Sequence, residues 1–430
     1  MAPAIEPVFT TNDLPKSTEV AIIGGGIVGL SAALYLAERG IPTVVLEKGT
    51  IACEQSSRNL GWIRKASRAA SDVPLALKAD ELWSGLAARV GRDVGYRQSG
   101  IMFLADSEED MNRHESWLES VSGLPIEPEC LSSSRVDQIV PGSGRSWIGG
   151  LYLRSDGRAE PTMAASAIAR AAIDKGAAII ENCGARSLTF EAGAVRGIRT
   201  ERGELRCQNV ILAGGIWSRR FLGNHGISLP TLPLVASVIA TDPIEGPTDI
   251  AVGGSDFSFR KRHDGGFTVT HRGALVAPIT LDHAMIGLRF LHQLNEQGDL
   301  LRISLGAHFL RDLKWPRRWS ANSVSPFERC RTMDPVPSAK INSEAMSNLA
   351  SAFPVFGRAT VRQTWAGMMD VTPDSLPAIG PVNGLSGLTI AAGFSGHGFG
   401  TAPAAGQLAA EMATGANTCV DPEPYRHDRF

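Results

Sequence analysis

The chain has 430 residues, of which 43% are hydrophobic and 20% are charged. This balance is typical of a globular protein with two or three domains, and it excludes extensive disorder. Lys and Arg number 42 against 44 Asp and Glu, which leaves a formal net charge of −2. A chain so close to neutrality has no general attraction for nucleic acid, so we expect no nucleic-acid partner.

The sequence shows no signal for a membrane segment or a metal. Residues 1–18 are polar and predict a loosely held tail without a secretory signal. No apolar run reaches the ~18 residues of a membrane-spanning helix. The six cysteines form no CxxC pair and the nine histidines no HExxH pair, so we expect neither disulfides nor a metal site. These features predict a cytoplasmic protein, free or peripheral at the inner face of the membrane, and leave a homo-oligomer open.

The first ordered unit is predicted to be a strand, a turn, a helix and a second strand. EVAII is a short apolar run from residue 19, and GGGIVG follows it at once. Apolar residues then recur at helical spacing until Gly40, and TVVLE over residues 43–47 is a second buried strand. Such a unit within about thirty residues predicts two parallel strands joined by a helix.

The later elements follow from the same patterns. Helices are expected at residues 74–90, 108–121, 281–297 and 401–415, with another from Pro161 to a stop at Gly176. Strands are expected at residues 100–105, 151–154, 177–180, 209–215, 232–241 and 387–393. A meander over residues 188–207 and a hairpin over 256–273, turning at a DGG sequence, complete the list.

Gly24, Gly26 and Gly29 form the pattern GxGxxG directly after the first strand. Glycine is needed for the tight turn, for the approach of a diphosphate to the backbone, and for close packing of helix on strand. The helix N-terminus, starting with Ile27 and Val28, then offers unpaired amides to the diphosphate. A carboxylate at the end of the second strand, here Glu47, accepts hydrogen bonds from a ribose. The pattern predicts a dinucleotide, either NAD or FAD, and no P-loop sequence competes with it.

Further motifs resemble the D-amino-acid oxidase superfamily of FAD enzymes, which includes D-amino-acid dehydrogenases, glycine oxidases and sarcosine oxidases. They are GGGIVG, EKG at 47–49, EQSSRNLGW at 54–62, VILAGGIWS at 210–218, TWAGMMDVTPDSLPAIG at 364–380 and AAGFSGHGFG at 391–400. The resemblance implies an α/β FAD-binding Rossmann-like domain of the glutathione-reductase type and a second, α+β substrate domain on a mixed antiparallel sheet. We place the FAD-binding domain at 18–95, 148–230 and 362–430, and the substrate-binding domain at 96–147 and 231–361.

The resemblance also implies which residues lie on FAD. Beyond the fingerprint, they come from the loop under the pyrophosphate, from a second close approach after residue 212, and from the last glycine motif. The full set is Gly24, Gly26, Ile27, Val28, Gly29, Glu47, Lys48, Ser56, Ser57, Arg58, Asn59, Gly61, Ala213, Gly214, Trp217, Gly367, Gly396, His397, Gly398 and Phe399. Gly367 occupies the position where relatives with covalently bound flavin carry a cysteine, so we expect non-covalent FAD.

The substrate side is predicted from the hairpin. Alternation places Phe257 and Phe259 on one face and Arg260 on the other, and an arginine in this sheet pairs with a substrate carboxylate in similar proteins. Arg260 is the preferred candidate, with Arg262 and Arg272 next, and a solvated hairpin edge is the alternative. Trp365, Asp370 and His397 complete the catalytic candidates, listed here with Arg260. His397 is expected to be structural or to contact the flavin rather than to act as an acid or base.

The reaction implied is removal of hydride from the carbon of an amine, giving an imine that water hydrolyses to an oxo acid and ammonia. The substrate expected is a small amino acid, plausibly a D-amino acid, and the electron acceptor is oxygen, a quinone or a redox protein. One alternative is a secondary or N-methyl amine oxidase of the sarcosine type. Another is the flavoprotein subunit of a multi-chain amine dehydrogenase, with RDLKWPRRWS at 311–320 as a docking face.

Overall fold

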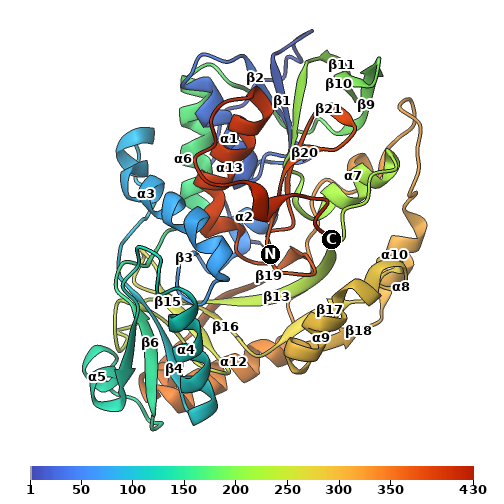
Figure 1. The fold of residues 1–430 in the computed structure, drawn as a ribbon. Helices are drawn as coiled ribbons and strands as arrows, with labels where there is room; N and C mark the ends of the chain where they lie inside the picture. The colour runs from blue at the N-terminus through green and yellow to red at the C-terminus, as the bar shows by residue number, and fades with distance from the viewer. Residues whose placement is uncertain (1) are drawn as a thin grey trace.

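The computed structural model describes residues 2–430, apart from the side chains of residues 296, 297, 299 and 307. Two large sheets organise the chain (Figure 1). A nine-stranded sheet takes its strands from the first half and from the C-terminal part of the chain. A ten-stranded sheet takes its strands from residues 101–153 and 232–371 and lies in the lower half of Figure 1.

The nine-stranded sheet has the order β11-β10-β21-β12-β1-β2-β8, with β20 beside β21 and β9 beside β10. Its strands are β1 (Val20–Ile23), β2 (Thr43–Leu46), β8 (Ala178–Ile180), β9 (Ala185–Glu191), β10 (Ala194–Thr200), β11 (Gly203–Arg206), β12 (Asn209–Leu212), β20 (Ala378–Val382) and β21 (Leu385–Ala392). The run from β21 to β8 is parallel. Both faces of these strands are buried, which explains their unbroken Val and Ile runs.

Helices cover one face of this sheet. They are α1 (Ile27–Ala37), α3 (Val73–Val90), α6 (Pro161–Asp174) and α13 (Gly398–Thr414). Helix α1 packs on α6 and α13, and α3 packs on α13, as the upper part of Figure 1 shows. The helix α7 (Ser218–Asn224) and the meander β9-β10-β11 enclose a second apolar cluster on the opposite face.

The ten-stranded sheet has the order β18-β17-β13-β16-β15-β14-β4-β6-β5, with β19 beside β13. Its strands are β4 (Ile101–Ala105), β5 (Glu129–Ser132), β6 (Gly149–Leu153), β13 (Leu232–Thr241), β14 (Ala251–Gly253), β15 (Ser258–Lys261), β16 (Phe267–Thr270), β17 (Leu275–Pro278), β18 (Leu301–Ser304) and β19 (Val361–Val371). Alternate residues of β4 face opposite ways: Met102 and Leu104 pack with α12 (Ala339–Ala352), whereas Phe103 faces the short strand β3 (Trp62–Ile63).

Most predicted elements are confirmed, and two expectations are wrong. The helix predicted at 281–297 is broken into α8 (Leu281–Ile286), a short 3₁₀ segment (Gly287–Phe290) and α9 (Leu291–Gln297), with the break at a glycine. Strands β6 and β19 lie in the ten-stranded sheet, although residues 148–230 and 362–430 are expected in the FAD-binding domain, and these domain boundaries stay a prediction. A buried apolar strand does not record which sheet it joins.

The N-terminal tail is the second correction, because it is held in place. The Glu6 amide donates to the Thr162 carbonyl, Arg170 pairs with the Glu6 carboxylate at 2.9 Å, and the Thr11 amide donates to Ile179. The tail therefore runs along α6 to the edge strand β8. Among the described residues, no helix is both long and apolar enough to cross a membrane.

Candidate functional site

The turn between β1 and α1 requires glycine. Gly24 has φ +112°, and a Cβ built on it would lie 2.3 Å from the Ala213 carbonyl oxygen. A Cβ on Gly29 would lie 2.2 Å from the Gly24 oxygen. Helix α1 begins after Gly26 with no side-chain cap and no acidic residue in its first turn. Apart from the Ile27 amide, which donates to Ser56 Oγ, its first amides and the positive end of its dipole are therefore left for an anionic ligand.

Glu47 is held by the same turn. The Gly25 amide donates to its Oε2 at 2.8 Å and the Gly49 amide to its Oε1 at 2.7 Å. Burial raises the pKa of this carboxyl, while Lys48 and the two amides lower it. Each oxygen keeps a lone pair, so the carboxylate can also accept a ribose hydroxyl.

A cavity of about 1230 Å³ runs from this turn to the N-terminus of α13. This cavity connects the glycine turn with the start of a second helix, as an extended dinucleotide requires. The predicted residues that line it are Gly24, Gly26, Ile27, Val28, Glu47, Lys48, Ser56, Asn59, Ala213, Gly214, Trp217, Asp370, Gly396, Gly398 and Phe399. Two helix N-termini thus face one cavity from its two ends, and the residues present fit FAD.

The loop around α2 (Gln55–Arg58) meets the cavity with only part of its predicted residues. Ser56 Oγ accepts the Ile27 amide at 2.9 Å, which fixes the loop on the first helix turn. The Arg58 guanidinium instead donates to Cys53 O and Ala366 O and pairs with Asp334, so it is a buried clamp outside the cavity lining. Ser57 and Gly61 also lie outside the lining.

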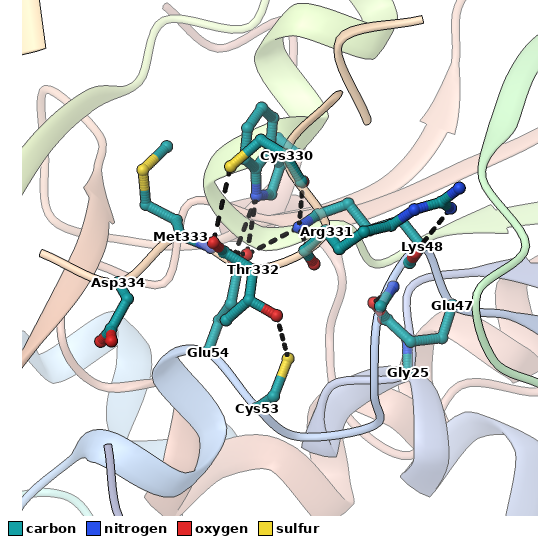
Figure 2. A network of polar contacts seen from close by, with 12 residues as sticks. Gly25, Glu47, Lys48, Cys53, Glu54, Cys330, Arg331, Thr332, Met333 and Asp334 are labelled. Carbon is teal, nitrogen blue, oxygen red and sulfur yellow. Dashed lines mark hydrogen bonds and ion pairs between the residues drawn. The ribbon is translucent and has the colours of Figure 1, made fainter. Parts of the chain in front are cut away.

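A segment that the sequence did not single out closes the cavity from outside. We call residues Cys330, Arg331, Thr332, Met333 and Asp334 the strap, and Figure 2 shows it lying across Lys48 and Glu54. Lys48 Nζ pairs with Glu54 at 2.7 Å and donates to the carbonyls of Cys330 at 3.1 Å and Arg331 at 2.7 Å.

The strap is also bound through its own amide and guanidinium groups. Glu54 accepts the Met333 amide at 2.8 Å and Trp217 Nε1 at 3.0 Å. Arg331 pairs with Glu201 and donates to the Lys48 carbonyl at 2.8 Å. These contacts join segments nearly 300 positions apart in the chain, so no local pattern could have predicted them.

Asp370 organises the turn from β21 into α13. Its Oδ2 accepts the Gly393 amide at 2.6 Å, and its carbonyl accepts the Ser395 amide at 3.0 Å. Burial raises the pKa of Asp370 to about 6, against the lowering effect of the backbone amides of Gly393, Asp370 and Phe394. Gly396, with φ +83°, then turns the chain into the helix, whose first turn has no side-chain cap. Asp370 therefore positions the amides that face the cavity.

His397 is the residue at which α13 begins, and it is neutral. Arg64 Nη2 donates to His397 Nε2 at 2.9 Å. Burial, followed by the charges of Arg68 and Arg64, holds the pKa of His397 well below its usual value. A neutral imidazole that accepts from a guanidinium cannot serve as a general acid at neutral pH.

Arg260, the preferred carboxylate ligand, is already paired. Its Nη1 and Nη2 lie 2.7 and 2.9 Å from the two Glu160 oxygens, its Nε donates to Leu60 O, and it is 2% exposed. Arg260 and Trp365 line a separate cavity of about 930 Å³. Trp365 and Asp370 are five residues apart on β19 and so point to opposite faces. The structure therefore does not gather the four catalytic candidates into one site.

Two other arginines lie against the ring of Phe103 on β4. The guanidinium carbon of Arg272, a secondary candidate, is 4.4 Å from the centre of the Phe103 ring, and that of Arg64 is 5.7 Å from it. Burial lowers the pKa of Arg64 to about 9, with the charges of Arg68 and Arg272 adding to the effect, and lowers that of Arg272 to about 10. Arg64 lies two positions after the motif EQSSRNLGW, but no sequence motif marks Arg64 itself as functional.

Residue 367, the position expected for covalent attachment of the flavin, has no room for a side chain. A Cβ on Gly367 would lie 2.2 Å from Gln55 Oε1 and 3.2 Å from the Arg58 Cβ. Gln55 Oε1 is itself buried without a hydrogen-bond partner among the described residues. A side chain at position 367 would therefore displace Gln55 from the wall of the cavity.

Comparisons with known proteins agree with this geometry. The structure of L-amino acid deaminase from Proteus myxofaciens in complex with anthranilate matches with a TM-score of 0.95 and 29% identity, covering 100% of this chain and 97% of that one. Sarcosine oxidase subunit beta from Arthrobacter sp is 25% identical over 96% of this chain and 91% of its own. Glycine oxidase from Geobacillus kaustophilus is 24% identical over 95% of this chain and 96% of its own.

Other relatives are longer. The chain spans less than half the length of the mitochondrial sarcosine dehydrogenases of Mus musculus and Homo sapiens, 43% and 42% respectively. The model of the family DAO, described as FAD dependent oxidoreductase, matches residues 19–412. This match confirms the resemblance drawn from the motifs, and the chain belongs to the DAO family of FAD-dependent oxidoreductases.

Proposed function

We propose that the protein oxidises the C–N bond of a small amino acid with non-covalent FAD. The observation that carries the proposal is one cavity faced by the N-termini of both α1 and α13, with Arg64 hydrogen-bonded to His397 just before the second helix. FAD bound there supplies the hydride acceptor. The carbon loses a hydride, the nitrogen loses a proton to solvent, and the resulting imine is hydrolysed to an oxo acid and ammonia.

The protein's own groups bind and orient the cofactor and the substrate. The α1 amides hold the diphosphate and Glu47 holds the ribose. The α13 amides stabilise negative charge at their end of the cavity, with Asp370 fixing the turn that presents them. Arg272 replaces Arg260 as our candidate for the substrate carboxylate, since its only hydrogen bond among the described residues is to the Gly254 carbonyl at 3.1 Å. No acid–base pair is required, because an amine that binds neutral needs positioning rather than activation.

The identity of the amino acid is open to direct test. The relatives are named for L-amino acids, glycine and sarcosine, so the D-amino acid remains a prediction from the sequence. A sarcosine-type activity on N-methyl or secondary amines is the second candidate, and it is favoured by the match over nearly the whole of the sarcosine oxidase beta subunit. That relative is named as a subunit, which also keeps the multi-chain amine dehydrogenase as a candidate.

The test is anaerobic reduction of the purified, FAD-loaded protein. We expect bleaching of the flavin absorbance by one of D-alanine, L-alanine, D-glutamate, L-glutamate, glycine, proline and sarcosine. Peroxide release in air, compared with dye or quinone reduction, then identifies the acceptor. Denaturation should release all FAD into the supernatant, which checks the non-covalent binding. Absence of bleaching by every amine tested would contradict the proposal.

A further inference from the structure

The substrate end of the site holds an excess of hydrogen-bond donors. Arg64 donates to the carbonyls of Ala66 and Ser67 and to His397, and Arg272 donates to the Gly254 carbonyl. Neither guanidinium has a carboxylate within ion-pair distance in the part of the chain that the structure describes. Both are only half exposed, so bulk water does not replace the missing anion.

The carboxylates whose charges act on these arginines have other partners. Asp110, which acts on Arg272, pairs with Arg113. Asp72, which acts on Arg64, pairs with Arg68 at 2.5 Å.

Asp156, which also acts on Arg64, pairs with Lys65 at 3.3 Å and accepts its amide at 2.8 Å. Other deeply placed arginines differ from Arg64 and Arg272 in this respect. Arg260 and Arg68 each have a dedicated carboxylate. Arg158 is an exception, since it is buried and also has no carboxylate within ion-pair distance among the described residues; Arg64 and Arg272 differ from it in lying against one ring, that of Phe103.

A third donor lies at the same ring. Trp62 stacks edge-on against Phe103 with ring centres 5.7 Å apart, and its Nε1 is buried without a hydrogen-bond partner among the described residues. A buried indole N–H normally finds an acceptor. Three groups that can only donate thus surround Phe103, on the face of β4 turned toward β3, and one of them, Arg64, reaches His397 just before α13.

We propose that the substrate carries two carboxylates, as in aspartate, glutamate or an N-carboxymethyl amino acid, one held by Arg272 and the other by Arg64. This inference rests on the proposed function, because it names the substrate class of that site. A substrate with one carboxylate would leave a half-buried guanidinium without an anion, which is costly. Two carboxylates give each guanidinium a bidentate partner and leave oxygens for the Trp62 N–H.

The test compares probes of matched length on the FAD-loaded protein. Binding of succinate and butyrate is followed by the change in flavin absorbance, which needs no turnover. We expect succinate to bind at least about 30-fold more tightly, as removal of one buried charge partner implies. The same preference should appear in kcat/KM for glutamate over glutamine and for aspartate over asparagine.

Variants of Arg64 test whether this residue binds the second carboxylate. Arg64→Gln should reduce the preference for succinate to about three-fold or less while leaving the affinity for butyrate unchanged, and Arg64→Lys should restore part of it. The matched control is Arg113→Gln, which removes a nearby charge from a side chain that is 62% exposed and should leave the preference intact.

Three results would overturn the inference. Equal affinity for succinate and butyrate, with flavin reduction by neutral amino acids, would reject the dicarboxylate and leave the proposed function standing. Equal weakening of both probes by Arg64→Gln would assign Arg64 to the cofactor. Absence of flavin reduction by any amine would reject the proposed function and the inference with it.

Discussion

The two ends of the cofactor cavity differ in how their charges are satisfied. At the nucleotide end, Lys48 and Glu54 pair with each other and with the strap, and Glu47 is held by two amides. At the other end, Arg64 and Arg272 have no carboxylate among the described residues. A permanently bound cofactor can be held by backbone groups whose neighbouring charges are already paired with each other. A substrate that binds and leaves needs charged groups that have no partner in the free protein.

The largest effect is expected at the closed end, from Gly24→Ala. The added methyl would meet the Ala213 carbonyl at 2.3 Å in a backbone conformation that alanine rarely adopts. We expect the protein to be purified without FAD and to fail to bind added FAD at micromolar concentration. The measurement is flavin absorbance after purification and after reconstitution.

Gly40→Ala is the control for this change. Gly40 also has a positive φ, +71°, but an added Cβ there would meet nothing within 4 Å. We expect a loss of about 1 kcal/mol in stability and a normal FAD content. If Gly24→Ala retained FAD as Gly40→Ala does, the tight turn would not be the basis of cofactor binding.

The difference between the ends also explains what the sequence could predict. The glycine motif could be recognised in the sequence because close contacts at each position allow only glycine and fix the spacing. The order β1, α1, β2 and Glu47 could then be predicted from it. The pairing of Arg260 with Glu160 was not readable, because alternation gives the face of a strand but not a partner 100 positions earlier. Arg64 and the strap were missed for the same reason, since both depend on contacts between distant segments.

The next largest effect is expected from Arg260→Met, which tests the corrected role of Arg260. Removal of the guanidinium leaves the Glu160 carboxylate buried without its partner, which costs about 3 to 5 kcal/mol. We expect this loss in urea unfolding of the FAD-loaded protein, with KM little changed in the molecules that remain folded. The double variant Arg260→Met with Glu160→Met should recover most of the stability.

Arg262→Met is the matched control on the same hairpin. Its partner Asp264 is 43% exposed, so we expect a loss below about 1 kcal/mol. A large rise in KM for Arg260→Met, without loss of stability, would return Arg260 to the substrate site.

Asp370 gives a smaller, pH-dependent effect. Its pKa is raised to about 6 in the folded protein, so the folded state binds more protons than the unfolded state between about pH 4 and 6. The stabilising contribution of the neutral form is therefore present below pH 4 and is lost as the pH rises through 6. We expect Asp370→Asn to remove about 2 to 3 kcal/mol of the fall in stability between pH 4 and pH 8.

Thermal unfolding of wild type and Asp370→Asn across this pH range, with and without added FAD, checks the prediction. Asp374→Asn is the control, because Asp374 is 38% exposed and pairs with Arg429 at the surface. Parallel curves for wild type and Asp370→Asn would show that Asp370 is ionised throughout.

The smallest effect is expected from Arg331→Gln in the strap. Arg331 is 34% exposed and does not line the cavity, and exposed ion pairs contribute about 1 kcal/mol or less. Its loss should loosen the strap over Lys48 without removing a cofactor contact, so FAD release should become about two- to five-fold faster at unchanged substrate KM.

Release is followed by the fluorescence of free FAD after dilution, with the exposed neighbour Arg329→Gln as the control. A rate equal to that of the control would mean that the strap does not limit release, and that the α1 amides and Glu47 hold the nucleotide by themselves. The difference between the two ends of the cavity would then lie only in the glycine turn at one end and the unpaired Arg64 and Arg272 at the other.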